Sequence, residues 1–99
     1  MIMDKEAFIP TREICSRYEV EIAFLEELSA RDLLEVQTVE ETPCVATERL
    51  GDLERYIRLH YELDINLEGI EVVCRLLDQL TEARRQIQLL ETRLRAFQD

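Results

Sequence analysis

Apolar residues recur at helical spacing in two short stretches near the beginning of the chain. The pair Pro10-Thr11 offers an N-cap for a first helix, which we expect over about 11–17. After a tight turn at about 18–20, a second helix is expected to end near Ser29. The apolar positions that support both helices are Ile14, Cys15, Tyr18, Ile22, Phe24, Leu25 and Leu28. Two short helices in succession predict a helix-turn-helix.

The following stretch changes from helical spacing to the alternation that is typical of strands. Leu33–Val39 carries β-branched residues in alternation, Glu40–Pro43 supplies a turn, and Cys44–Ala46 can return as a partner strand. The pattern predicts a small wing-like β-hairpin after the helix-turn-helix.

A third helix is expected to begin at Thr47, its predicted cap, and to end near Glu62. Its apolar stripe consists of Leu50, Leu53, Ile57 and Tyr61. The segment Asp64–Asn66 interrupts the pattern, and Asn66 is a good N-cap for a fourth helix. Glu68 then lies in the first turn, where the helix dipole favours an anion.

The fourth helix is long for so small a chain. Between Leu67 and Phe97 there is no proline, and the single glycine, Gly69, falls in the first turn. About 30 residues at a rise of about 1.5 Å give a helix of about 45 Å, which is too long for the core of a small domain. Apolar residues alternate in steps of three and four at Val73, Leu76, Leu80, Ala83, Ile87, Leu90, Leu94 and Phe97. This spacing predicts a coiled-coil seam.

The seam predicts a homodimer through the distal half of this helix. The expected interface residues are Leu80, Ala83, Ile87, Leu90, Leu94 and Phe97. An antiparallel pair can bring Arg84 of one copy against Glu91 of the other, a contact worth roughly 0.2–1 kcal/mol when exposed. Alternatively, Val73, Leu76 and Leu80 pack back on the first and third helices of the same chain, which leaves the part beyond Ala83 for a partner.

Together these elements predict a mainly helical, all-α class of fold with a small β wing. We expect a winged helix-turn-helix domain with its third helix over 1–66, and a coiled-coil dimerisation helix over 67–99. With 99 residues, of which 46% are hydrophobic, the chain can bury one modest core.

Charge restricts the possible partners. The sequence has 22 Asp and Glu against 12 Lys and Arg, a formal charge of −10. Such a surface repels phosphates and anionic lipids. Apolar stretches are short, and Met1–Glu6 lacks a basic segment followed by a hydrophobic run. We therefore expect no signal peptide and no membrane span, and a cytoplasmic protein.

Residues that could carry catalysis or bind a metal do not form a motif. Cys15, Cys44 and Cys74 are widely spaced without a Cys-x-x-Cys pair, so we expect reduced and mostly buried cysteines. His60 has no Ser or Cys nucleophile nearby, and we interpret it as either a packing residue or a helix C-terminal residue, where a cation suits the helix dipole. The adjacent Glu26 and Glu27 point in different directions. We expect a protein that is not an enzyme, with no catalytic residue, cofactor or metal.

In order and spacing, these elements resemble the MerR-like family: a helix-turn-helix, a wing, a third helix and a long dimerisation helix. The resemblance covers nearly the whole chain. More closely, the sequence is similar to the CbpM-type chaperone modulators through Glu13-Ile14-Cys15, Tyr18-x-Val20, Phe24-Leu25-x-x-Leu28 and the run RLHYELDINLEGI from Arg58 to Ile70. The resemblance implies a protein that binds the J-domain of a DnaJ-like co-chaperone called CbpA and restrains its activity.

The sequence departs from the DNA-binding members of the MerR-like family. When Val20 and Leu33-Leu34 are aligned with the Gly-Val and Gly-Leu landmarks of that family, Ala23, Glu26 and Glu27 stand where DNA-binding members carry an Arg and an Arg-Tyr pair. Glu40 and Glu41 stand in the wing, where those members usually carry basic residues. Contacts from Lys and Arg to phosphate supply most non-specific DNA affinity, so carboxylates here oppose docking on DNA.

We name the acidic residues of the helix-turn-helix and the wing the acidic face: Glu19, Glu21, Glu26, Glu27, Glu40 and Glu41. The acidic face predicts a basic protein partner, and the second helix of J-domains is rich in Lys and Arg. Three alternatives remain open at this point. The charges form only a solvated surface, or the chain is a dimeric MerR-type DNA-binding transcriptional regulator, or it is an adaptor for another protein.

Overall fold

The computed structural model describes residues 7–98. The chain divides into two compact units, with the boundary between Leu67 and Glu68. In the described residues, the first unit holds three α-helices and a three-stranded sheet, and the second is one long helix. The prediction of a mainly helical chain with a small β wing and a long C-terminal helix is confirmed.

The helix-turn-helix is formed by α1 (Thr11–Tyr18) and α2 (Ile22–Ala30), each within about one residue of its predicted end. Ile14 on α1 and Leu25 and Leu28 on α2 are fully buried. Ile22 differs from the expectation of a buried apolar face. It begins α2, remains 48% exposed and lines an open cleft.

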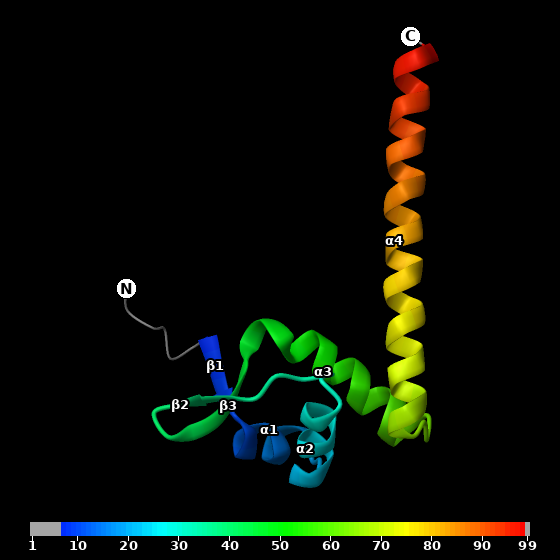
Figure 1. The fold of residues 1–99 in the computed structure, drawn as a ribbon. Helices are drawn as coiled ribbons and strands as arrows, with labels where there is room; N and C mark the ends of the chain where they lie inside the picture. The colour runs from blue at the N-terminus through cyan, green and yellow to red at the C-terminus, as the bar shows by residue number, and fades with distance from the viewer. Residues whose placement is uncertain (1–6, 99) are drawn as a thin grey trace. The chain divides into compact units, whose positions relative to one another are not determined.

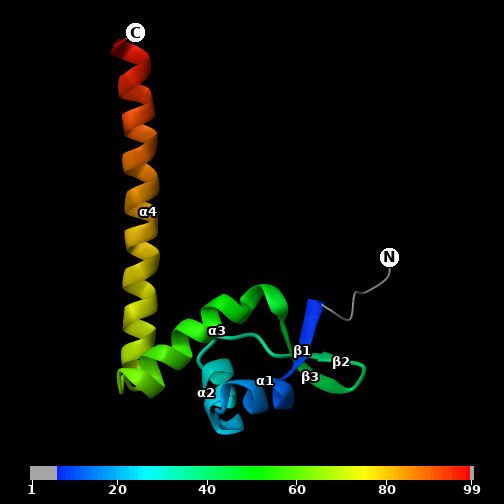
Figure 2. The same cartoon turned by 180° about the vertical axis from the view of Figure 1, so that it is seen from behind.

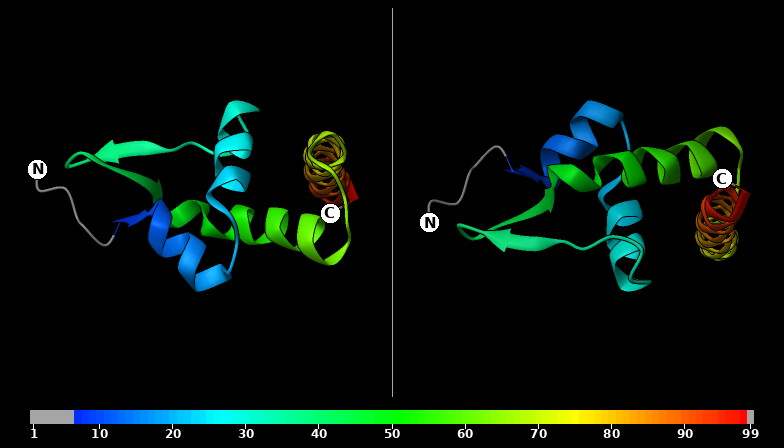
Figure 3. Two further views of the ribbon diagram at one scale, coloured as in Figure 1. Left: turned by 90° about the horizontal axis from the view of Figure 1, so that it is seen from below. Right: turned by 90° about the horizontal axis from the view of Figure 1, so that it is seen from above.

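The wing belongs to a three-stranded antiparallel sheet in the order β1-β3-β2. The hairpin of β2 (Gln37–Val39) and β3 (Thr42–Ala46) projects away from the helices of the first unit (Figure 1; Figure 3). The predicted return strand is therefore confirmed, and it begins two residues earlier. Sequence analysis missed β1 (Phe8–Pro10), which pairs with β3 through Ile9 opposite Val45.

The predicted strand over Leu33–Val39 is wrong for its first half. The Leu33 N–H donates to the Leu28 carbonyl at 2.9 Å and so closes the end of α2. The Leu33 carbonyl accepts a hydrogen bond of 2.9 Å from the Tyr56 hydroxyl. Because these partners occupy the backbone of Leu33, strand pairing begins only at Gln37.

The third helical segment is not one regular helix. A 3₁₀ turn η2 (Thr47–Arg49) leads into α3 (Leu50–Ile57), and a π-helical turn η3 (Arg58–Glu62) follows (Figure 2). The predicted cap is wrong: Thr47 lies inside η2, Ala46 holds the N-cap position, and the Thr47 hydroxyl donates to the Ala7 carbonyl at 3.4 Å.

The predicted apolar stripe of this segment holds only in part. Leu53 is fully buried, but Tyr61 is 43% exposed and Tyr56 is buried instead. In η3 the Leu63 N–H donates to the Arg58 carbonyl, five residues back. Bonds of this kind hold more residues per turn than an α-helix, so positions beyond Ile57 rotate away from the predicted stripe.

The core of the first unit lies between α1, α2, α3 and the sheet. Its buried apolar residues are Ile14, Val20, Phe24, Leu25, Leu28, Leu34, Cys44, Val45, Leu53 and Tyr56. None of the three cysteines is in a disulfide, as expected, but only Cys44 is buried, while Cys15 and Cys74 are half-buried. The expectation of mostly buried cysteines is therefore wrong. Burial still raises the pKa of the Cys15 thiol above its ordinary value.

The second unit is α4 (Leu67–Gln98), an unbroken helix of 32 residues, which begins directly after Asn66, its predicted cap. At about 1.5 Å per residue it is about 48 Å long. No helix in residues 7–98 is long and apolar enough to cross a membrane.

Candidate protein-binding face

α2 has one buried and one exposed side. Phe24, Leu25 and Leu28 are buried, whereas Ala23, Glu26 and Glu27 are exposed. Residues three and four apart share one side of a helix, so position 23 lies beside 26 and 27. The helix that would read DNA in a DNA-binding member thus presents carboxylates to solvent. The other members of the acidic face, Glu19, Glu21, Glu40 and Glu41, are exposed as well.

Glu19 ends α1 in a left-handed conformation, with φ 55° and ψ 48°. Its N–H and that of Val20 both donate to the Cys15 carbonyl, the second at 3.1 Å. This is a Schellman-type helix end, at which glycine is the preferred left-handed residue. The helix dipole also disfavours a negative charge at a helix C-terminus. Glu19 therefore lowers the stability of the chain in two ways.

Glu40 and Glu41 form the two-residue loop of the hairpin. Val39 pairs with Thr42 across the hairpin. The two loop residues between them have positive φ angles, 51° for Glu40 and 64° for Glu41. Positive φ at both loop residues is the requirement of a type I′ turn, for which Asn-Gly is strongly preferred. The tip of the wing therefore holds two carboxylates in a conformation that glutamate adopts poorly.

Every described non-glycine residue with a left-handed backbone conformation is an Asp or a Glu. The residues with positive φ are Glu19, Asp32, Glu40, Glu41 and Asp64. Three of these five belong to the acidic face. Backbone strain retained at exposed positions is a reason to look for function there.

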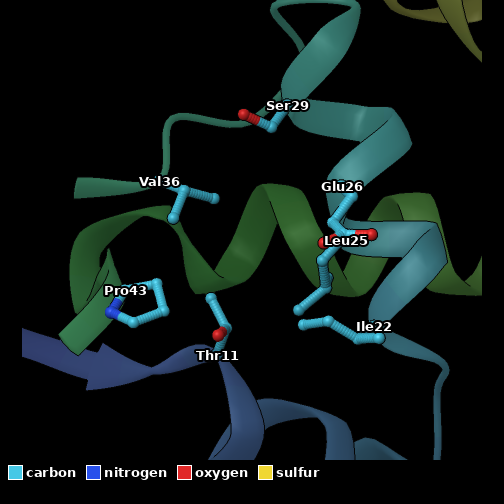
Figure 4. Close-up of a pocket in the computed structure, with 7 residues that line it drawn as sticks. All are labelled: Thr11, Ile22, Leu25, Glu26, Ser29, Val36 and Pro43. Carbon is cyan, nitrogen blue, oxygen red and sulfur yellow. The ribbon is translucent and has the colours of Figure 1, made fainter. Parts of the chain in front are cut away.

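Open depressions on the surface connect α2 with the wing. A cleft of about 330 Å³ has Glu26 on its rim and includes Thr11 and Pro43 (Figure 4). The adjoining depression shares Thr11 and Pro43 and extends to Arg12 and Glu41. Glu26 and Glu41 therefore line two neighbouring depressions that share Thr11 and Pro43, although they are 15 positions apart in the sequence. The grouping of these carboxylates was predicted from the sequence, but the cleft was not.

Glu19 and Glu21 lie between α1 and α2 and line neither of these two depressions. The Glu21 N–H donates to the Tyr61 hydroxyl at 3.4 Å, which ties the turn to η3. The acidic face thus has two parts: one around α2 and the wing, and one at the turn.

His60 packs beneath α2. Its ring stacks on Phe24 with centroids 4.8 Å apart, and its edge meets Tyr61. Its Nδ1 lies 2.9 Å from the Ile65 carbonyl. A carbonyl only accepts, so Nδ1 carries the proton and donates. These contacts agree with the interpretation of His60 as a packing residue.

Tyr18 joins α1 to α3. Its hydroxyl donates to Glu54 Oε2 at 2.7 Å, and this hydrogen bond is the main reason why the pKa of Tyr18 is raised above its ordinary value, with burial second. Glu54 is thereby engaged within the chain, in contrast to a carboxylate that is offered to a partner.

The acidic excess is concentrated in the helix-turn-helix and the wing. Between Thr11 and Ala46 the sequence has nine Asp or Glu and three Arg. Over 68–99 it has six Asp or Glu and five Arg. The segment that holds the helix-turn-helix and the wing therefore carries most of the net negative charge.

The predicted seam residues of α4 are exposed in the single chain: Leu80, Ala83, Ile87, Leu90, Leu94 and Phe97. Leu90 is 60% exposed and Phe97 is 90% exposed. Arg85 forms an ion pair with Glu82 within the helix, at 2.7 Å between Nη2 and Oε2. The seam positions form an apolar stripe on α4 that is exposed within the part of the chain that the structure describes.

The helix-turn-helix, the wing and the long following helix define a winged helix-turn-helix protein. The sequence model of the MerR HTH family of regulatory proteins matches residues 9–92, and the chain belongs to this family. Searches of curated proteins and of solved structures gave no significant match.

Proposed function

We propose that this chain is a chaperone modulator, which binds the J-domain of a DnaJ-like, CbpA-type co-chaperone and restrains its activity. One observation carries the proposal: α2 and the wing expose carboxylates where DNA-binding members of the family carry basic residues. A J-domain offers a second helix rich in Lys and Arg. Opposite charges on two surfaces speed and orient their association.

Two further features support this proposal. The wing keeps Glu40 and Glu41 at left-handed positions, at a cost in stability that asparagine and glycine would avoid. The run from Arg58 to Ile70 resembles the CbpM-type modulators. The proposal includes a cytoplasmic homodimer that pairs through α4, has no catalytic role and does not bind duplex DNA.

Titration calorimetry with the J-domain of a CbpA-type co-chaperone tests the proposal, beside a gel-shift assay with duplex DNA at near-physiological salt. We expect saturable binding of the J-domain, a loss of co-chaperone activity on addition of the chain, and no shift of the DNA. Tight, sequence-selective DNA binding without a J-domain signal would overturn the proposal in favour of a DNA-binding regulator.

A further inference from the structure

The cleft between α2 and the wing is lined mainly by apolar side chains. Figure 4 shows Thr11, Ile22, Leu25, Val36 and Pro43 around a common space, with Glu26 and Ser29 on the helix beside it. Leu25 and Thr11 are 1% and 5% exposed and form the floor, while Ile22 stands as an exposed wall. These residues come from α1, α2, β3 and the segment before β2, so the fold itself builds the cleft.

The size of the cleft suits a large aliphatic side chain. Its volume is about 330 Å³. For comparison, an engineered apolar cavity of about 150 Å³ in another protein is sufficient for benzene. Filling the cleft removes apolar surface from water, which stabilises a complex.

Carboxylates lie on the rim of the cleft and in the depressions next to it. Glu26 lies on the α2 side, and the adjoining depression that shares Thr11 and Pro43 reaches Glu41. A further depression along the wing includes Glu40, Arg12 and Thr42. An apolar centre with a charged rim is the usual anatomy of a protein interface.

The negative charge around the cleft restricts the kind of partner that can bind there. A DNA backbone would bring phosphates against Glu26 and Glu41, which repel it. A second copy of the chain would bring another acidic surface, because nine Asp or Glu and three Arg lie between Thr11 and Ala46. A basic protein surface with an apolar residue at its centre matches both the cleft and its rim.

We infer that the cleft receives one aliphatic side chain from the basic helix of the partner, with Lys and Arg on either side of it facing the α2 and wing carboxylates. The inference rests on the proposed function, since it takes the J-domain as the partner. It adds a division of roles: the carboxylates set the rate of association, and the cleft sets the lifetime of the complex.

Binding kinetics of the full chain with the J-domain of a CbpA-type co-chaperone test this division. Ile22→Ala removes one wall of the cleft at an exposed position, so the fold is expected to remain. We expect dissociation about tenfold faster, which corresponds to about 1.4 kcal/mol, with an unchanged association rate and salt dependence. Glu26→Gln with Glu27→Gln should show the opposite pattern, with slower association and a weaker dependence on salt.

Two further variants test the cleft, one by blocking it and one as a control outside it. Ser29→Phe places a ring at the mouth of the cleft without removing a core residue, and it should also accelerate dissociation. Leu89→Ala removes a similarly exposed aliphatic side chain from α4, outside the cleft and the seam, and should leave both rates unchanged. Circular dichroism of each variant shows that it is folded.

The outcomes separate the two proposals. If Ile22→Ala and Ser29→Phe dissociate like the unaltered chain while the charge variants associate slowly, the cleft is not the anchor site and the proposed function stands. If the unaltered chain does not bind the J-domain, both the proposed function and this occupant are overturned. Duplex DNA binding that Ser29→Phe blocks would assign the face to nucleic acid and would also overturn the inference.

Discussion

Glu40 and Glu41 illustrate how single residues balance stability against charge. With positive φ at both positions, each glutamate is in a conformation that costs an L-residue other than glycine about 1–2 kcal/mol. Both side chains are exposed, so burial does not repay this cost. Glu40 and Glu41 place two negative charges at the tip of the wing, which an Asn-Gly turn would lack.

Replacing Glu40→Asn and Glu41→Gly together should therefore stabilise the fold and weaken binding. We expect the free energy of unfolding to rise by about 2 kcal/mol, the low end of the summed cost at the two positions, because Asn-Gly suits a type I′ turn. Denaturant unfolding at fixed protein concentration measures the gain, and calorimetry with the J-domain measures the loss of affinity. The control is Glu26→Gln with Glu27→Gln, which removes two charges from helical backbone and should give no such gain. An unchanged midpoint for the hairpin variant would show that the turn is not strained.

For single residues, the positions of turns and the packing of His60 could be predicted from the sequence, but left-handed backbone angles could not. The turn at 18–20 and the place of the hairpin turn, which the structure narrows to Glu40-Glu41, were predictable from local pattern, as was the packing of His60. The left-handed angles of Glu19 and Glu41 were not, because glutamate lacks the conformational preference by which glycine or asparagine marks such a position. The cleft was also out of reach, since Thr11, Leu25 and Pro43 meet only in the folded chain.

Among the elements, helices with an apolar period were predictable and short or irregular elements were not. α1, α2 and α4 follow from spacing alone. β1 has only three residues and depends on pairing with β3, far along the chain. The π-helical turn η3 adds a residue to a turn without a break in composition, so the stripe through Tyr61 was misplaced. Long-range pairing and irregular turns are the features that local patterns do not encode.

The predicted dimer seam on α4 can be tested with a single substitution. Leu90→Asp places a charge in the centre of the proposed seam, where pairing would bury it without a partner. We expect this variant to sediment as a monomer and the unaltered chain to sediment as a dimer. Leu89→Asp makes the same change at a neighbouring exposed position outside the seam and should leave the dimer intact. A Leu90 variant that remains a dimer, or a Leu89 variant that dissociates, would contradict the seam.

Over the whole molecule, charge is divided unevenly between the two units. The helix-turn-helix and wing carry nine Asp or Glu against three Arg, while the residues over 68–99 are close to neutral. The class of fold and the order of its α-helices and wing hairpin were predictable from the sequence, and the family match over 9–92 agrees with them. The partner was not predictable from composition alone, because charge specifies the sign of a partner's surface and not its shape.

The uneven distribution of charge predicts that the location of the acidic residues, rather than the net charge of the chain, controls binding of the J-domain. Glu26→Lys with Glu27→Lys reverses two charges beside the cleft and should slow association with the J-domain roughly tenfold. The dependence of the association rate on salt should also decline, because it reflects charges that interact within a Debye length of about 8 Å.

Asp78→Lys with Glu82→Lys is the matched control, since it changes the net charge equally on α4 and outside the predicted seam. The exposed pair of Glu82 with Arg85 contributes little to stability, so its loss should leave the fold intact. Stopped-flow association at several salt concentrations distinguishes the two variants. Equal slowing by both would show that overall charge alone steers the partner. Slowing by the α2 variant alone, with the dimer unchanged in sedimentation, would locate the encounter on the face formed by α2 and the wing.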